Sequence, residues 1–271
     1  MSSDFLPEHT RLVMAHPDDE VLWASSILGR VEQTVLCFGD VASQPGWSEG
    51  RRRSVAEYPV ANVVRLDMPE SEVFDRAAWP NPVETEYGLA VQVNSPAQPG
   101  VNEPLYRQTY GRLVDKLRPL LDGCSTVVTH SPWGEYGHEE HVQVFRAVSD
   151  LQAQMGFTLW VPGYVSDKSY ALMLRHLSRL DRSLPPQPTD PALGEQIKAL
   201  YMRNGCWTWF DDYVWPETEF FYRWMGPDEK PVRPRAGSVI HINMLWINWR
   251  PRLLPSLLKR IRRGSIRLLG Q

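Results

Sequence analysis

Short, almost entirely apolar runs alternate with helix-like segments through the first 165 residues of this 271-residue chain. Four of these runs are predicted to be buried strands: 11–15, 34–38, 63–66 and 126–129. Apolar residues recur at helical spacing between and after them. Strands that are apolar on both faces and alternate with helices are typical of a parallel sheet covered on both sides. We therefore expect an α/β fold, a Rossmann-like and mostly parallel sheet with helices on both faces.

The rest of the chain is expected to extend this core. Residues 1–182 are predicted to form the core, with an insertion at 67–103 that is rich in Pro, Asn and Gly and lacks periodicity. Residues 183–249 begin with a Pro-rich linker and hold six of the 11 Trp residues. They are interpreted as a C-terminal aromatic-rich extension that caps the substrate. Residues 250–271 are predicted to form a basic amphipathic tail.

Composition excludes several classes of protein. With 42% apolar and 23% charged residues, the chain is not intrinsically disordered. Three scattered cysteines cannot form a disulfide framework. The N-terminus lacks the features of a signal peptide, and no apolar run approaches the roughly 18 residues of a membrane span. These observations predict a cytoplasmic protein.

The net charge of -3 conceals an asymmetry. Seven of the 29 basic residues lie in 250–271, which has no acidic residue, so the preceding part holds 22 basic and 32 acidic side chains. Such an acidic body argues against a nucleic-acid partner. Leu and Ile recur at helical spacing beside the basic residues of the tail, which favours peripheral contact with an anionic (inner) membrane surface or with an amphipathic substrate. A tail helix docked on the acidic body is the alternative.

Two clusters of chemically active side chains follow two of the predicted strands. The first is Ala15–Glu20 (AHPDDE), and the second is Ser131–His141 (SPWGEYGHEEH). Each places metal-ligand residue types three apart, which is the spacing of one helical turn. Alone, each cluster is explained equally well by a turn or a solvated helix start. Together, at the sheet edge where α/β proteins bind ligands, they indicate a catalytic zinc site made of two imidazoles and one carboxylate, with a neighbouring carboxylate as general base.

The same clusters resemble those of the LmbE-like / PIG-L family of zinc-dependent deacetylases. That family carries (A/P)HPDDE after its first strand and Gly-His-x-Asp-His after a later one. Members remove the acetyl group from N-acetylglucosamine linked to various aglycones, glycopeptide-antibiotic pseudoaglycones among them. The resemblance covers roughly residues 10–165. This chain has Glu140 where the family usually has Asp, and the family's later Ser-Gln is not evident here.

The resemblance implies roles for individual residues. His16, Asp19 and His141 would hold one zinc ion per chain. Asp18 would be the general base, and His138 the general acid or transition-state stabiliser. The two remaining members of the implied catalytic set are Glu140, which would orient His138, and Tyr136, which would lie near the developing oxyanion.

Substrate contacts are less constrained. We consider three candidates: Asp40, just past the second predicted strand, Trp133 in the second cluster, and Arg53 in the arginine run 51–53, for which a solvated helix is the alternative. For His130 we favour a structural role or one behind the metal ligands.

The sequence as a whole predicts a zinc-dependent hydrolase that removes an N-acetyl or N-acyl group from a glucosamine unit on a larger aglycone. A metal-binding glycan or lipid module without hydrolysis, a hydrolase of a different amide, and iron as the native metal remain alternatives.

Overall fold

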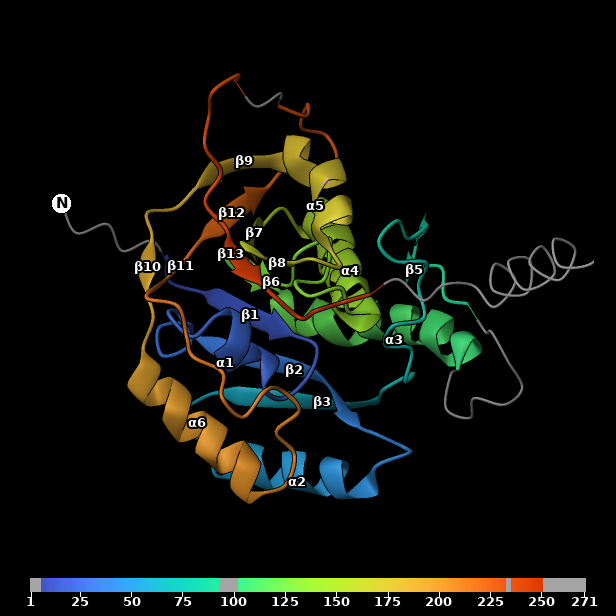
Figure 1. Cartoon of the computed structure of the whole chain (residues 1–271), viewed down its shortest axis with the longest axis vertical. Coiled ribbons are helices and arrows are strands. Elements are labelled where there is room, and N and C mark those ends of the chain that lie inside the picture. Colours follow the sequence, from blue (N-terminus) through green and yellow to red (C-terminus); the bar gives the residue numbers. More distant parts are fainter. Residues whose placement is uncertain (1–5, 93–101, 233–234, 251–271) are drawn as a thin grey trace, which may run out of the picture.

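A seven-stranded sheet forms the centre of the computed structural model, which describes residues 6–92, 102–232 and 235–250. Its strand order is β3-β2-β1-β6-β7-β12-β9 (Figure 1). Five neighbouring strands are parallel: β1 (Thr10–Met14), β2 (Gln33–Asp40), β3 (Val63–Pro69), β6 (Thr126–Thr129) and β7 (Thr158–Pro162). Two antiparallel strands complete one edge, β12 (Phe221–Trp224) and β9 (Leu180–Ser183). The expected α/β class with a mostly parallel sheet is confirmed.

Helices and small two-stranded sheets surround this centre. The helices are α1 (Asp19–Trp23), α2 (Pro45–Ala56), α3 (Glu103–Leu121), α4 (Glu139–Met155), α5 (Tyr170–His176), the 3₁₀ helix η1 (Leu177–Arg179) and α6 (Pro191–Arg203). The small sheets pair β4 (Glu84–Thr85) with β5 (Gly88–Leu89), β10 (Gln187–Pro188) with β11 (Thr218–Glu219), and β8 (Tyr164–Ser166) with β13 (Asn243–Leu245). No described helix has both the length and the hydropathy needed to cross a membrane.

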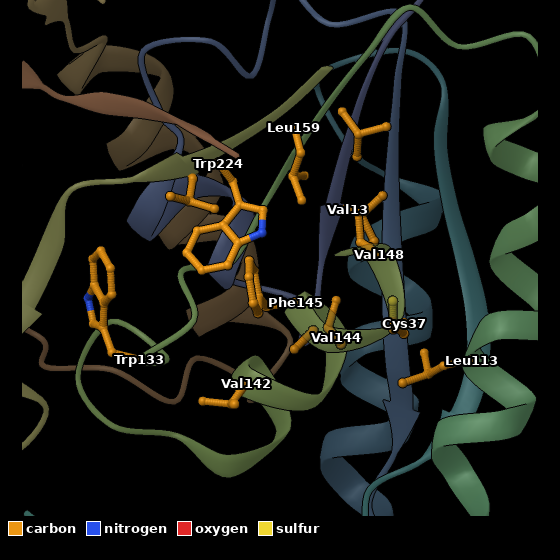
Figure 2. Close-up of a cluster of buried hydrophobic side chains, with 14 of the residues drawn as sticks. Val13, Cys37, Leu113, Trp133, Val142, Val144, Phe145, Val148, Leu159 and Trp224 are labelled. Carbon is orange, nitrogen blue, oxygen red and sulfur yellow. The ribbon is translucent and has the colours of Figure 1, made fainter. Parts of the chain in front are cut away.

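Both faces of the sheet are buried because side chains alternate along each strand. Val13 and Leu159 lie on one face and pack with α3 and α4, where Leu113 and Val148 meet them (Figure 2). A second cluster on the other face packs against α1 and α6, and comprises strand residues Leu12, Met14, Leu36, Val128 and Trp160 with Val21, Ile197 and Tyr201. This double burial explains why the central strands carry apolar residues on both faces.

Two expected elements differ from the structure for identifiable reasons. The apolar stretch 159–164, which is typical of one strand, breaks at Gly163, whose N–H donates to Phe220 O, so that β7 and β8 are separate. The helical spacing after Val21 does not continue, because α1 ends at Trp23. Beyond it, the carboxylate of Glu219 accepts the N–H groups of Ser25 and Ser26, which competes with helical hydrogen bonding.

The segments outside the expected core contribute to the sheet and to its cover. Strand β12 pairs with β7, and α6 packs on α1 and α2. The insertion expected at 67–103 contains the end of β3 and the β4–β5 pair, while 93–101 lie outside the described residues. Of the basic tail, only Arg250 falls within the described residues.

Candidate metal centre

The two clusters found in the sequence meet where the strand order reverses. β1 lies between β2 and β6, so the loops after β1 and β6 leave the same edge of the sheet in opposite directions. The carboxyl ends of parallel strands at such a switch point form the usual ligand crevice of open α/β sheets. The fold therefore brings the HPDDE and HEEH side chains together, as expected.

The loop after β1 has an unusual backbone. Asp18 caps α1 with φ 116° and ψ -25°, a conformation that non-glycine residues rarely adopt. Its N–H donates to Glu20 Oε2 at 2.9 Å, and Asp19 N–H donates to His16 O at 3.2 Å. Glu20 in turn accepts the buried hydroxyls of Tyr58 and Tyr201. Backbone strain of this kind persists only where the surroundings enforce it, and it is concentrated at functional sites.

The loop after β6 depends on glycine. Gly134 has φ +66°, and a Cβ there would lie 2.6 Å from His138 O. The tight turn that glycine allows brings the chain back so that His138 caps α4 and His141 lies in its first turn. The spacing His138–His141 therefore places both imidazoles at the same helix end.

Three predicted ligands converge at the centre of the site. Asp19 lies between two buried imidazoles, with Oδ2 3.1 Å from His16 Nδ1 and Oδ1 3.2 Å from His141 Nε2. Ligand bonds of about 2 Å in a tetrahedral zinc site place neighbouring ligand atoms ~3 Å apart, so this spacing fits a zinc ion. His141 Nε2 is buried and makes no hydrogen bond, which a metal bond would satisfy.

A glutamate contacts the second nitrogen of each of these histidines. Glu140 Oε2 lies 3.1 Å from His16 Nε2, and Glu135 Oε2 lies 2.7 Å from His141 Nδ1. Carboxylates behind histidine ligands fix the ring and raise its basicity. Burial would raise the pKa of Glu135, but His130 and His141 beside it hold the pKa near 2. The carboxylate is therefore ionised behind its histidine.

The electrostatics of the site favour a cation. Burial alone would lower the pKa of His16, but Glu70, Asp19 and Glu140 raise it well above the ordinary value. Burial alone would raise the pKa of Asp19, but His141 and His16 hold this pKa well below its usual range. Such a concentration of buried carboxylates favours positive charge nearby, which a bound divalent ion would supply.

Among the described residues, three groups have ligand atoms within 4.8 Å of one another: His16, His138 and His141; Asp19, His130 and His141; and His16, Glu70 and Glu140. Each of the first two contains two of the predicted ligands together with another histidine. His130 stacks on His141 with ring centroids 3.9 Å apart, and both of its nitrogens are engaged. Its Nε2 accepts Ala15 N–H, while Nδ1 faces Glu135, so it supports the site from behind. His138 uses Nδ1 to accept Glu140 N–H at 3.2 Å, which leaves Nε2 as the nitrogen for chemistry in the cavity.

The expected role of Glu140 is wrong in this structure. Its carboxylate does not contact His138; instead it faces His16 and accepts Ser71 N–H at 2.6 Å. The position in the first turn of α4 directs the side chain towards the β1 loop. The contacts of the His138 ring instead include the backbone N–H of Glu140, which donates to Nδ1, and the stacked rings of His141 and Phe74, 4.6 Å and 4.9 Å away between centroids.

Asp18 has an environment different from that of Asp19. Its Oδ2 accepts the N–H and the hydroxyl of Thr208. Burial and the charge of Asp19 raise the pKa of Asp18 to about 7, although Arg51 and Thr208 oppose the shift. A carboxylate with a pKa near neutrality suits a general base. Tyr136, half-buried at the same cavity, lies 5.3 Å from His141 between ring centroids.

The site opens into a cavity of about 570 Å³. Its polar and charged lining includes His16, Asp18, Asp19, Glu70 and His138. Its aromatic lining consists of Trp47, Phe74, Tyr136, Trp209, Phe210 and Trp249. The cavity therefore combines a charged reaction centre with an aromatic lining.

None of the three expected substrate contacts lines this cavity. Trp133 is a core residue whose indole N–H donates to Tyr164 O at 2.6 Å (Figure 2). Asp40 is exposed and pairs with Arg52, and Arg53 reaches Asn204 on the surface. The positions of these three residues therefore do not support the expectation that they contact the substrate.

Sequence reasoning missed three cavity or support residues. Arg51, not Arg53, lies buried at the cavity and pairs with Glu70. Ser48, Arg51 and Ser54 recur three apart on the inner face of α2, a spacing that distinguishes Arg51 from its neighbours. Glu135 and Lys168 carried no such signal, because their roles depend on contacts between loops.

No family model and no curated protein matches the sequence. Among solved structures, the chain is similar to a deacetylase–bog complex in the biosynthesis pathway of teicoplanin, with a TM-score of 0.55 and 14% identity over 82% of this chain and 100% of that one. It is also similar to the zinc inhibited form of teicoplanin deacetylase Orf2, with a TM-score of 0.51 and the same identity and coverage. The chain has the fold of these deacetylases. The motif resemblance and the three-dimensional comparison thus lead to the same architecture.

Proposed function

We propose that this protein is a metal-dependent deacetylase that hydrolyses the N-acetyl or N-acyl amide of a glucosamine unit carried by a larger aglycone. The convergence of His16, Asp19 and His141 beside the independent carboxylate of Asp18 carries this proposal. Structural neighbours described as deacetylases support it. A binding module would have no need of a buried base next to a metal site.

The ligand set fits zinc, with one ion per chain. A bound zinc ion would supply Lewis acidity and a water whose pKa is lowered to about 7. His16, Asp19 and His141 would hold it, with Glu140 and Glu135 behind the imidazoles. Two nitrogens, one carboxylate and an open position are the usual composition of a catalytic zinc site.

Proton transfer is assigned to Asp18. Its carboxylate would accept a proton from the attacking water and return it to the leaving amine, because it lines the cavity and has a pKa of about 7. Thr208 holds the carboxylate through Oδ2, which leaves Oδ1 for the proton.

His138 is assigned to the carbonyl oxygen. Burial and the neighbouring His141 and His16 lower its pKa well below the ordinary value, so the ring is neutral. Because Nδ1 accepts a backbone N–H, the proton of the neutral ring lies on Nε2, which would donate to the developing oxyanion. The motif resemblance allows His138 to be a general acid or a transition-state stabiliser, and a neutral ring that carries its proton on Nε2 favours transition-state stabilisation. The Tyr136 hydroxyl, whose pKa burial raises well above its usual value, would be a second donor.

The first test combines metal analysis with acetate release from a panel of N-acyl amino sugars and simple amides. Asp18→Asn should reduce kcat at least about 100-fold while zinc content stays unchanged, since general-base catalysis contributes roughly 10²–10⁴-fold. Asp40→Asn, an exposed carboxylate paired with Arg52, is the matched control and should retain full activity. Full activity of Asp18→Asn would refute the role of Asp18 as general base. Tightly bound zinc without hydrolysis of any panel member would indicate a binding module instead.

A further inference from the structure

Glu20 is a fully buried carboxylate that the proposed mechanism does not use. It does not line the cavity, so it does not reach the substrate. Its Oε2 accepts the N–H of Asp18 at 2.9 Å, and its Oε1 accepts the hydroxyl of Tyr201 at 2.8 Å and the hydroxyl of Tyr58. Because a buried carboxylate is costly unless donors surround it, these hydrogen bonds fix Glu20 in place. We call Glu20, Tyr58 and Tyr201 the Glu20 network.

Both tyrosines reach Glu20 because two helices approach each other closely. Tyr58 lies just beyond the end of α2, Tyr201 lies in the last turn of α6, and their ring centroids are 6.2 Å apart. Gly50 of α2 permits this approach, since a Cβ there would clash with the carbonyl oxygen of Asn204, directly after α6. The two hydroxyls that meet at one oxygen of Glu20 therefore come from packed helices and not from the loop after β1.

The chain that follows Tyr201 also holds the side chain of Asp18. Thr208 donates its N–H, at 3.2 Å, and its hydroxyl, at 2.5 Å, to Asp18 Oδ2. Asp18 is thus held at its backbone by Glu20 and at its carboxylate by Thr208. A non-glycine residue with φ 116° persists only where its surroundings enforce this conformation, and these attachments supply the enforcement.

The neighbouring aspartate is held by donors of its own. Asp19 Oδ2 accepts the N–H of His16 at 2.7 Å, and Asp19 Oδ1 accepts the indole N–H of Trp23 at 2.8 Å. Neither donor belongs to the Glu20 network. Disturbing this network should therefore displace Asp18 and leave the predicted metal ligand in place.

We propose that the Glu20 network positions the catalytic carboxylate of Asp18 by enforcing the left-handed backbone at that residue. The catalytic part of this inference rests on the proposed function, whereas the effect on the backbone does not. The members of the network are positioning residues, since none of the three lines the cavity. A displacement of about 1 Å at a reacting group can cost roughly 100-fold in rate. The network should therefore control kcat and leave KM and zinc affinity unchanged.

Removing the two tyrosine hydroxyls tests the effect on catalysis. Tyr58→Phe and Tyr201→Phe keep the rings, and each leaves one hydroxyl donor to Glu20. The double variant should lose at least about tenfold in kcat, and each single variant should lose less. Tyr164→Phe is the matched control, because it removes an equally buried hydroxyl from a different buried glutamate, Glu219, and it should retain full kcat.

Three outcomes of these measurements would overturn the proposal. The first is an unchanged kcat of the double variant. The second is an equal loss of kcat in Tyr164→Phe, which would make the effect one of general stability. The third is a loss of zinc affinity together with kcat, because the network would then hold the metal site as a whole.

The Cα and Cβ chemical shifts of Asp18 give a readout that does not require hydrolysis. These shifts depend on φ and ψ, so they distinguish a left-handed residue from an extended or helical one. The unmodified protein and Tyr164→Phe should show left-handed shifts, whereas the double tyrosine variant and Glu20→Gln should move towards the ordinary regions. If the unmodified protein hydrolyses no member of the panel, the proposed function fails and the shifts alone decide the positioning. Left-handed shifts retained by the double variant and by Glu20→Gln would refute the positioning role.

Discussion

Asp18 and Asp19 are consecutive carboxylates with opposite electrostatic surroundings. Histidines flank Asp19 and lower its pKa, whereas burial and the Asp19 charge raise the pKa of Asp18 to about 7. Neighbouring acids whose pKa values are separated in this way can take different roles. In the proposed function, this separation is the reason for giving the metal to Asp19 and the proton to Asp18.

Thr208→Val tests this assignment through the pH profile. The substitution removes a hydroxyl that donates to the ionised form of Asp18, so the pKa of Asp18 should rise further. Activity that requires the carboxylate is lost as pH falls through that pKa. The acidic limb of kcat/KM against pH should therefore move to higher pH, by up to about one unit, or ~1.4 kcal/mol. An unmoved limb would mean that another group controls it.

Glu135→Gln tests the support of the metal site. Loss of the charge behind His141 should weaken zinc affinity by about 10- to 100-fold, as is typical for partners of metal-bound histidines. Competition with a chromophoric chelator measures this, with far-ultraviolet circular dichroism to confirm the fold. Glu57→Gln, an exposed glutamate paired with Arg203, is the control. Equal zinc affinities of the unmodified protein, Glu135→Gln and Glu57→Gln would contradict the role of Glu135 in supporting the metal site.

At the scale of elements, α4 holds the loop that follows β3. Glu139, next to the metal-site residues, accepts the N–H groups of Asp75, Arg76 and Ala77 and the indole N–H of Trp79. Lys168 faces the same loop: its Nζ lies 3.4 Å from Asp75 Oδ1 and 4.5 Å from the centre of the Phe74 ring. The two consecutive glutamates of the HEEH motif therefore have separate tasks, since Glu140 faces His16.

Glu139→Gln should loosen this loop. The amide group would place an N–H opposite a backbone donor, and leaving buried groups unpaired costs about 1–3 kcal/mol. Hydrogen exchange of residues 71–79 should accelerate, and KM should rise more than kcat falls, because Phe74 and Asp75 line the cavity. Glu195→Gln, exposed on α6, should change neither quantity. Unaltered exchange in 71–79 would exclude the anchoring role.

At the scale of the whole molecule, the aromatic-rich C-terminal part is joined to the N-terminal part by a buried carboxylate. Glu219 in β11 accepts the N–H and hydroxyl groups of Ser25 and Ser26 and the hydroxyl of Tyr164. β12 also supplies a strand of the central sheet. These contacts argue for one cooperative unit despite the sequence boundary near 183.

Glu219→Gln tests this unity. Replacing a buried acceptor of five donors with an amide should lower the free energy of unfolding by about 2–4 kcal/mol, while unfolding remains a single transition. Urea denaturation followed by tryptophan fluorescence and circular dichroism should give coincident curves. Two separated transitions would show instead that 183–249 unfolds on its own.

Local patterns predicted the fold class and the residues that meet at the metal centre. Apolar strands, strand-end clusters and i, i+3 spacing are properties of short segments, so His16, Asp19 and His141 could be found from them. The partners of Glu135 and Glu140 depend on how two loops meet across the sheet edge, which no local pattern encodes. The spacing of Ser48, Arg51 and Ser54 marks a common face of α2, but only the packing of α2 on the sheet shows that this face, with Arg51, is turned inward.

The left-handed backbone at Asp18 has a consequence for protein engineering. A four-residue His-Pro-Asp-Asp graft would carry the side chains into a new scaffold without the hydrogen bonds that hold this conformation. Glu20 secures the Asp18 N–H, and Tyr58 and Tyr201 secure Glu20. The smallest transferable unit is therefore the turn together with its three supporting residues, drawn from three different parts of the chain.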